Sequence, residues 1–497
     1  MNQIISIPFK QARVAQTFEE PLIFELSYSG KIGFTIDNRD LESIELEIPK
    51  KYLRDELNLP EVSEPEVLRH YTRLSTWNYG IDLNFYPLGS CTMKYNPRIN
   101  EEIANKEYFL HLHPSLDEKY IQPLLKLIYE LQNYIKTLTD MDDVSLQPAA
   151  GAHGELAGIF LIRAYHKSKN NNHKNLVLIP DSAHGTNPAT CTFAGFEVKE
   201  LKSTKEGTID IQQLKSVMNE NVAALMITNP NTLGIFETNI REVSDILHEH
   251  DALLYMDGAN YNAIIGKVSF SQMGIDVAHL NLHKTFSTPH GGGGPGAGAI
   301  VVSSRLKDFL PGPVVRYDSQ KDYYYFDFPE KSIGRLKAGI GHTSMMIRAL
   351  VYILSWGNQI HKIAEHSVLN ANLIRSELES HLKLASPNPT MHEVVFSHHT
   401  LKKHGYETVH LAKTLIDYGF HPPTVYFPLI VPGAIMIEPT ETESPETILK
   451  FTQAVKDILR RMENQDQEIF KSPLTSFVNR VDEVGIAKNL ILKYFTK

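Results

Sequence analysis

Short apolar runs that alternate with helical patterns are the feature that most constrains the fold of this chain of 497 residues. The apolar runs occupy residues 175–179, 223–228, 252–256 and 297–302, and helical periodicity first appears at residues 124–138. Strands that alternate with helices form a mostly parallel sheet, because parallel strands need long crossover connections. We therefore expect an α/β domain with its functional site at the carboxyl ends of the strands.

The two ends of the chain have different patterns from this middle part. Residues 1–95 are rich in proline, tyrosine and charge and have little periodicity, which indicates an N-terminal arm draped over other structure. Residues 96–343 form the predicted large α/β domain. Helical patterns at 344–356 and 445–463 flank a mixed region, so residues 344–497 are expected to form a smaller α+β domain.

The composition excludes several functional classes. A chain of this length with 42% hydrophobic and 22% charged residues is typical of a soluble protein with two or three domains. The net charge of −9 argues against a nucleic-acid surface. The two cysteines favour a reducing compartment, which predicts a cytoplasmic protein, and no metal-ligand spacing is recognised. No segment approaches the roughly 18 apolar residues of a membrane span, so no membrane anchor is expected.

A lysine and an aspartate are the strongest candidates for a catalytic site. Asp257 directly follows the apolar run 252–256, and Lys284 lies 27 residues further on. This interval suits one strand end, a crossover and the next strand end, which would bring both side chains to one rim of the sheet. Pyridoxal phosphate requires this pair, because its aldehyde condenses with a lysine amine and its ring nitrogen stays protonated beside an anion. Taken singly, a lysine after a strand is usually a solvated surface group, and an aspartate before glycine is usually a turn residue.

Small residues open a helical pattern that could bind the cofactor phosphate. Gly151 and Ala152 precede the amphipathic run 156–165, and free N–H groups at a helix start bind anions. Such a glycine is also common as a plain helix cap. The four-glycine run 291–294 is not a nucleotide-binding loop, since no Gly-Lys-Ser/Thr follows it, and it is interpreted as permissive backbone beside the cofactor ring.

Three further residues are weighed as site residues. His184 lies on the loop after the apolar run 175–179, where an imidazole could stack on a pyridine ring, although many histidines are structural. Asn229 ends the run 223–228 and could donate to the phenolate oxygen of the cofactor, although Asn-Pro is also an ordinary turn. Cys91 has no identified base partner, so it is interpreted as a small buried hydrophobe.

Six strings together resemble the glycine-cleavage P-protein (glycine dehydrogenase, aminomethyl-transferring) family. They are LGSCTMK, QPAAGAHGEL, DSAHGTNPA, MDGANYNA, HLNLHKTF and PHGGGGPG. The resemblance implies a fold-type-I pyridoxal-phosphate enzyme that decarboxylates glycine and transfers the aminomethyl group to the lipoyl arm of the H-protein. Members occur as one long chain of two related halves or as two subunits, and only the second half carries the lysine. With a single HKTF, this chain is similar to subunit 2 of the split form, which implies a subunit 1 partner and an α2β2 assembly.

The resemblance also implies roles for particular residues. Lys284 would bind the cofactor covalently, Asp257 would pair with the pyridinium and His184 would stack on the ring. The Gly151-Ala152 loop and His283 would lie near the phosphate, and residues 90–94 would border the pocket. Two other functions stay open at this point: another fold-type-I enzyme, either an aminotransferase or an amino-acid decarboxylase, and a non-catalytic scaffold half.

Overall fold

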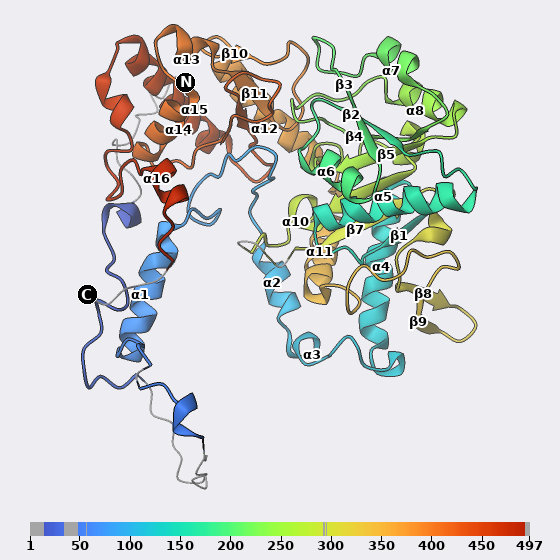
Figure 1. Ribbon diagram of the computed structural model, residues 1–497, viewed down its shortest axis with the longest axis horizontal. Coiled ribbons are helices and arrows are strands. Elements are labelled where there is room, and N and C mark those ends of the chain that lie inside the picture. Colours follow the sequence, from blue (N-terminus) through green and yellow to red (C-terminus); the bar gives the residue numbers. More distant parts are fainter. Residues whose placement is uncertain (1–13, 34–47, 56, 292–293, 295, 493–497) are drawn as a thin grey trace.

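The protein consists of a large α/β domain, a smaller C-terminal domain and an extended N-terminal arm (Figure 1). The computed structural model describes residues 14–33, 48–55, 57–291, 294 and 296–492. Among these residues, no helix combines the length and the apolar character that crossing a bilayer requires.

A seven-stranded sheet forms the centre of the large domain, in the order β1-β7-β6-β5-β4-β2-β3. The strands are β1 (Asp143–Ser145), β2 (Leu176–Pro180), β3 (Glu197–Leu201), β4 (Val222–Thr228), β5 (Leu253–Gly258), β6 (Val277–Asn281) and β7 (Gly298–Val302). Strands β3, β2, β4, β5 and β6 are parallel, whereas β7 is antiparallel to both β6 and β1. The expected mostly parallel α/β architecture is confirmed, and the reversed direction of β7 is an addition to it.

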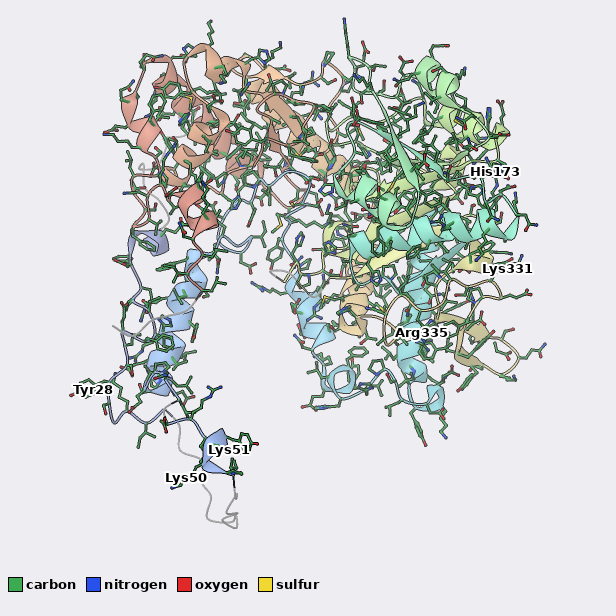
Figure 2. The ribbon with its side chains drawn as sticks, viewed as in Figure 1. Tyr28, Lys50, Lys51, His173, Lys331 and Arg335 are labelled. Carbon is green, nitrogen blue, oxygen red and sulfur yellow. The ribbon has the colours of Figure 1, made fainter. Side chains whose placement is uncertain are left out.

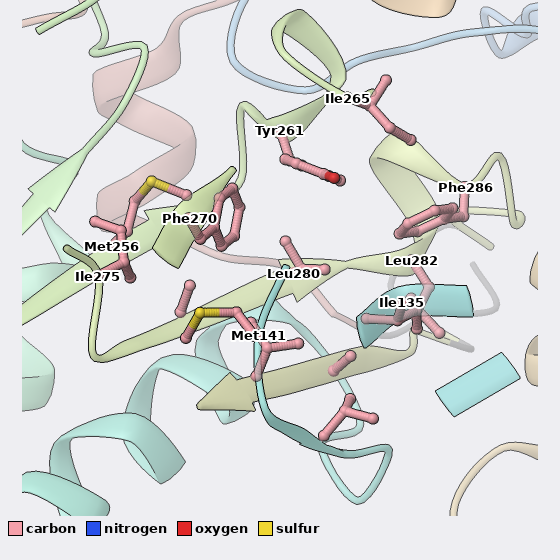
Figure 3. Close-up of a cluster of buried hydrophobic side chains, with 14 of the residues drawn as sticks. Ile135, Met141, Met256, Tyr261, Ile265, Phe270, Ile275, Leu280, Leu282 and Phe286 are labelled. Carbon is pink, nitrogen blue, oxygen red and sulfur yellow. The ribbon is translucent and has the colours of Figure 1, made fainter. Parts of the chain in front are cut away.

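Helices cover both faces of this sheet, because successive strand residues point to opposite sides. In β4, Leu225 belongs to one core cluster and Ala224 to the other. The first cluster includes residues of α4 (Gln122–Thr139) and α8 (Ile240–Glu249), and Figure 3 shows part of it around Tyr261, Phe270 and Leu280. The second cluster includes residues of α5 (Gly151–Ser168) and α6 (Thr186–Phe193). The large-domain helices are α2 (Arg98–Ala104), α3 (Glu107–Leu110), α4 (Gln122–Thr139), α5 (Gly151–Ser168), α6 (Thr186–Phe193), α7 (Ile211–Val217), α8 (Ile240–Glu249), α9 (Phe270–Met273), α10 (Leu282–Thr285) and α11 (Thr343–Trp356).

The small domain is built on a four-stranded antiparallel sheet in the order β10-β11-β13-β12. Its strands are β10 (Lys383–Leu384), β11 (Val394–Ser397), β12 (Thr424–Val425) and β13 (Ile435–Ile437). Its helices are α12 (Lys362–Leu378), α13 (His399–Lys403), α14 (Thr408–Asp417), α15 (Pro445–Glu463) and α16 (Glu483–Lys488). Helices α12, α14 and α15 share a separate apolar core with this sheet.

The packing of α11 bears on the predicted boundary between the two domains at residue 344. Met346, Leu350 and Ile353 of α11 are buried in the core of the large domain, together with residues of α4. We therefore propose a division between α11 and α12, because apolar packing assigns α11 to the large domain. The helical pattern at 344–356 could not reveal this, since a period shows that a face is buried but not against what.

The sequence predicts an arm of residues 1–95. We keep the name arm for the described residues from η1 (Val14–Thr17) to the end of α1 (Glu64–Trp77), and residues 78–95 follow as a separate segment. A capping box between Ser63 and Glu66 begins α1, and His70 is its single fully buried residue in the described structure. Figure 1 shows α1 extending away from the small domain, and Figure 2 labels Tyr28, Lys50 and Lys51 on the arm, remote from both domains. Minor elements are a hairpin of β8 (Val314–Asp318) and β9 (Tyr323–Asp327) and the 3-10 helices η2 (Lys50–Tyr52), η3 (Glu118–Tyr120), η4 (Tyr261–Ala263), η5 (Lys307–Phe309), η6 (Gly357–Gln359) and η7 (Gln467–Lys471).

A buried lysine joins the segment after the arm to both domains. Lys94 is 3% exposed, and its Nζ lies 2.7 Å from Glu441 Oε1 of the small domain. The same amine donates to the Thr285 carbonyl at 2.8 Å, to Asn262 Oδ1 at 2.9 Å and to Tyr352 Oη at 3.0 Å. These bonds satisfy the charge that burial would otherwise penalise. They also fix the end of α10, the helix that carries Lys284.

Replacing Lys94 by methionine is expected to lower the free energy of unfolding by about 3–5 kcal/mol, because Glu441 would be left buried without its cation. Denaturant unfolding followed by circular dichroism measures the change. The control is Lys215→Met, which breaks an ion pair with Glu242 whose side chains are about half exposed, 49% and 50%. That variant should lose at most about 1 kcal/mol. Equal losses in the two variants would contradict a structural role for the buried pair.

Candidate active site

A cavity of about 140 Å³ lies at the carboxyl ends of the central strands. Strands β4, β5 and β6 end in Thr228, in Asp257 and Gly258, and in Asn281, and the chain continues from β6 directly into α10 with Lys284. The cavity is lined by Ser90, Gly151, Ala152, Glu155, His184, Thr186, Thr228, Thr232, Asp257, Ala259, Asn260, His279, Asn281 and Lys284. The site therefore occupies the edge of the sheet at which parallel strands bring their ends together.

Lys284 reaches the cavity from the first turns after β6. Its Nζ donates to the Ser90 carbonyl at 2.8 Å. Ser90 belongs to the segment that follows the arm, so one wall of the cavity comes from a part of the sequence 194 residues away. The amine is thus held at the cavity by a neutral acceptor.

Asp257 is buried beside Lys284 and keeps its charge. Its Oδ1 lies 3.2 Å from His279 Nε2 and 2.9 Å from the Ala259 amide, and its Oδ2 accepts from Asn187 Nδ2 at 3.2 Å. Burial raises the pKa of Asp257, but His279, the Ala259 amide, Lys284 and Asn187 together hold this pKa below its usual value. The aspartate is therefore an anion at neutral pH.

His279 is itself fixed by a tyrosine. The Tyr255 hydroxyl lies 2.6 Å from His279 Nδ1. Burial, together with Glu155 and Asp257, raises the pKa of Tyr255 well above its usual value, so the hydroxyl keeps its proton and donates to Nδ1. The Nε2 atom of His279 is then the N–H that faces Asp257. This relay orients the imidazole and leaves the carboxylate as the acceptor.

The start of α5 forms the opposite wall through Gly151 and Ala152. A Cβ on Gly151 would lie 2.6 Å from Asn281 Nδ2, so a larger residue would require Asn281 or the start of α5 to shift. The first N–H groups of a helix have no intrahelical partner and bind anions. Cβ atoms on Gly296 and Gly298 would lie 2.8 Å from the carbonyls of Ala149 and Ala150, so the chain after the four-glycine run crosses this loop directly. Residues 292, 293 and 295 lie outside the described part of the chain.

His184 lies at the exposed rim of the cavity and is linked to a buried carboxylate. Its Nδ1 is 2.9 Å from Thr186 Oγ1, which donates to Glu155 Oε2 at 3.0 Å. On its other side, the His184 ring contacts the Phe427 ring of the small domain edge-on, with centroids 5.6 Å apart. The imidazole is therefore held from both domains.

His283 and Asn229 are not among the residues that line the cavity. His283 Nδ1 is 3.3 Å from the Ala297 carbonyl, and burial, assisted by His290 and Lys284, lowers the pKa of His283 to about 4, so the ring is neutral. Asn229 Oδ1 accepts from the Glu237 amide at 3.0 Å. The structure brings together Lys284, Asp257, His184, Gly151 and Ala152. The roles of His283 and Asn229 stay predictions.

Several buried polar atoms around the cavity have no hydrogen-bond partner within the described structure. They are Glu155 Oε1, Asn187 Oδ1, Thr228 Oγ1, Asn229 Nδ2, Asn260 Oδ1 and Asn281 Oδ1. Such atoms are uncommon in folded proteins, which indicates that this place is built for a polar ligand. An amine, a buried carboxylate and a helix start suit the aldehyde, the ring nitrogen and the phosphate of pyridoxal phosphate.

Glu155, Thr228, Asn260, His279 and Asn281 were not anticipated as site residues. In β6, His279 and Asn281 are the polar residues of an otherwise apolar strand, and their spacing of two places them on one face. That pattern could have identified them. Glu155 had no such signal, because a glutamate in a helix is usually exposed.

Comparison with known proteins identifies the family. Residues 158–416 match the aminotransferase class-V family model, and residues 363–477 match the model for the glycine dehydrogenase C-terminal domain. A probable glycine dehydrogenase (decarboxylating) subunit 2 of Aquifex aeolicus is 52% identical over 476 residues, which cover 95% of this chain and 98% of the relative. The chain belongs to the glycine dehydrogenase (decarboxylating) subunit 2 family. A relative from Pyrococcus abyssi with the same name is 48% identical over 98% of this chain and 97% of its own length.

Solved structures agree with this family in fold. A crystal structure titled glycine decarboxylase (P-protein) of the glycine cleavage system, in inhibitor-bound form, superposes with a TM-score of 0.70, 19% identity and coverage of 83% of this chain and 93% of that chain. A NifS-like protein superposes with a TM-score of 0.58, 14% identity and coverage of 76% and 100%. At these identities the likeness concerns the fold alone. The expected family and the fold-type-I pyridoxal-phosphate architecture of this glycine dehydrogenase subunit are confirmed.

Replacing Gly151 by alanine is expected to weaken pyridoxal-phosphate binding by about tenfold or more, because the new methyl group would push α5 away from Asn281. Equilibrium titration of the cofactor-free protein with pyridoxal phosphate measures the affinity. Gly185→Ala is the matched control, since a Cβ there meets nothing within 4 Å although the residue neighbours His184. Unchanged affinity in the Gly151 variant would contradict a close approach of α5 to the ligand.

Proposed function

We propose that this chain decarboxylates glycine with pyridoxal phosphate and transfers the aminomethyl group to the lipoyl arm of the H-protein, releasing CO2. The observation that carries the proposal is the meeting of Lys284 with the buried Asp257 in one cavity. The relatives that share nearly the full length are named glycine dehydrogenase (decarboxylating) subunit 2, which supports this reaction over other reactions of the fold.

Five residues would hold the cofactor. Lys284 would bind it covalently through Nζ, Asp257 would pair with the ring nitrogen, and His184 would lie over the ring. The N–H groups at Gly151 and Ala152 would bind the phosphate. When bound, pyridoxal phosphate supplies an electron sink for the bond to the leaving carboxylate.

The protein side chains contribute charge and position to this reaction. His279 and Tyr255 keep Asp257 ionised and oriented, which maintains a negative charge in a buried site at neutral pH. Ser90 holds the Lys284 amine through its carbonyl. The electron pair of the broken bond stays behind when CO2 leaves. The aminomethyl carbon would form a bond to one sulfur of the lipoyl disulfide as the S–S bond breaks, and the second sulfur would take up a proton. The oxidation of glycine is thus balanced by reduction of that disulfide, and the reaction requires neither nicotinamide nor flavin.

The name of the family implies a partner, subunit 1, and we propose that the arm is one of its docking surfaces in an α2β2 assembly. Large apolar side chains on the arm are exposed, which is typical of an interface rather than of a free surface. They include Leu57, Leu59, Leu68 and Tyr71, of which Leu68 is 68% exposed.

Cys91 and Cys191 are free thiols, which supports a reducing, cytoplasmic location.

Lys284→Ala is expected to abolish exchange of labelled bicarbonate into glycine, because the chain loses the amine that binds the cofactor. The exchange is measured with and without subunit 1 and lipoylated H-protein, and Lys267→Ala, an exposed lysine paired with Glu365, serves as control. Borohydride reduction followed by peptide mapping should place the cofactor on Lys284. Label on another residue, or exchange that is independent of the carrier, would contradict the proposal.

The double substitution Leu68→Glu and Tyr71→Glu is expected to weaken association with subunit 1 by about 100-fold or more, because two exposed apolar anchors on α1 are lost. Analytical ultracentrifugation of the mixed subunits measures the affinity of this association. Arg69→Glu changes the charge of the same helix without removing apolar surface, and it should retain most of the affinity. Unaltered assembly in the double variant, or self-association of this chain through α1 instead, would rule out this docking surface.

A further inference from the structure

Two buried glutamates of the small domain contact the backbone that holds Lys284. We call residues 89–92, which lie between the arm and the large domain, the Ser90 loop. Glu393 Oε2 accepts from the Ser90 amide at 2.9 Å. Glu438 accepts from the Thr92 amide at 2.9 Å and from Thr92 Oγ1 at 2.6 Å. The Ser90 carbonyl accepts from Lys284 Nζ, so each glutamate reaches the lysine through a few bonds of this loop.

The Ser90 loop has a conformation that its own sequence does not favour. Ser90 has φ 65° and Thr92 has φ 50°, values that are rare outside glycine and unusually costly for a β-branched residue. A Cβ on Gly89 would lie 2.6 Å from Met436 Sδ, so the loop is pressed against β13. The bonds to Glu393 and Glu438 therefore maintain a backbone that would relax without them.

One of the two carboxyl groups is held in its neutral form. Burial raises the pKa of Glu393 well above its usual value, and the neighbouring Glu438 adds to this shift. The Ser90 amide and Lys284 oppose it. Glu393 therefore carries a proton at neutral pH, and its Oε1 is the oxygen without a partner in the described structure. Both oxygens of Glu438 accept hydrogen bonds from Thr92. The carboxyl oxygens of Glu393 and Glu438 lie within 4.8 Å of each other, which is why Glu438 contributes to the raised pKa of Glu393.

We propose that Glu393 and Glu438 are positioning residues that lock the Ser90 loop, so that the Ser90 carbonyl holds the Lys284 amine at the cavity only when the small domain is docked. Neither glutamate lines the cavity. The catalytic role of Lys284 rests on the proposed function, whereas the positioning of its amine by the Ser90 loop does not. The titratable groups whose pKa values Lys284 shifts are Cys91 on the loop, Asp257 at the end of β5, His283 on α10, His290 on the following loop, and His392 and Glu393 before β11. Glu155, His184 and His279 line the same cavity as the lysine.

The test is the rate at which an amine-reactive reagent labels Lys284 in the cofactor-free full-length chain, measured by peptide mass spectrometry. Glu393→Leu and Glu438→Leu should each raise the rate about tenfold, because the freed loop no longer holds the amine. Glu393→Gln should behave as the native chain, since a neutral amide offers the same acceptor to Ser90 as the protonated acid. Glu438→Gln should still raise the labelling rate above that of the native chain. The amide group has a single acceptor oxygen, so it cannot accept both hydrogen bonds from Thr92 as the two Glu438 oxygens do.

Thr92→Val keeps the proposal testable if a leucine variant fails to fold. It preserves the side-chain shape and removes one bond to Glu438, so an intermediate labelling rate is expected. Equal labelling rates in all variants would overturn the proposal. Labelling rates that rise equally in Glu393→Gln and Glu393→Leu would also overturn it. A stoichiometric metal ion in the native chain, with labelling that changes on chelation, would instead assign His392, Glu393 and Glu438 to a metal site and overturn it. Labelling needs neither cofactor nor glycine, so its outcome is separate from that of the proposed reaction.

Discussion

Burial of the central strands on both faces is the constraint on which the rest of the structure depends. All seven residues of β4 and all five of β6 are buried, so these strands cannot carry polar groups along their length without partners. The polar side chains gather instead at the strand ends, where Asp257, Asn281 and Lys284 meet at one cavity. The parallel direction of β4, β5 and β6 makes those ends coincide. The site thus follows from the same burial that stabilises the domain.

Much of this arrangement can be predicted from the sequence. The strand that precedes Asp257 and the spacing to Lys284 predict their proximity, because parallel strands end on the same edge. Helix α15 begins and ends at the residues that the periodicity predicts, Pro445 and Glu463. The edge strand β3 was not expected, because its residues Glu197–Leu201 are mostly charged and exposed. Charge on an edge strand obscures the strand pattern while it prevents pairing with other chains.

Other features have no local signal. An apolar run does not encode direction, so the antiparallel β7 was beyond sequence reasoning. The bond between Ser90 and Lys284 joins residues 194 positions apart, and only the family resemblance pointed to the loop as a border of the pocket. His279 and Tyr255 contact each other across the neighbouring strands β6 and β5, so this contact can be foreseen only when the register of the sheet is known. Such contacts depend on tertiary structure rather than on propensity.

The distance along the chain between Thr92 and Glu438 has a consequence for biosynthesis. These residues are 346 positions apart, and their hydrogen bonds complete the wall of the cavity that carries Ser90. Chains emerge from the ribosome N-terminus first, and domains fold as they appear. The large domain can therefore collapse while the small domain is still being translated. A finished lysine pocket arises only after the chain around Glu438 has been synthesised and folded against Thr92, which delays cofactor capture until the small domain is in place.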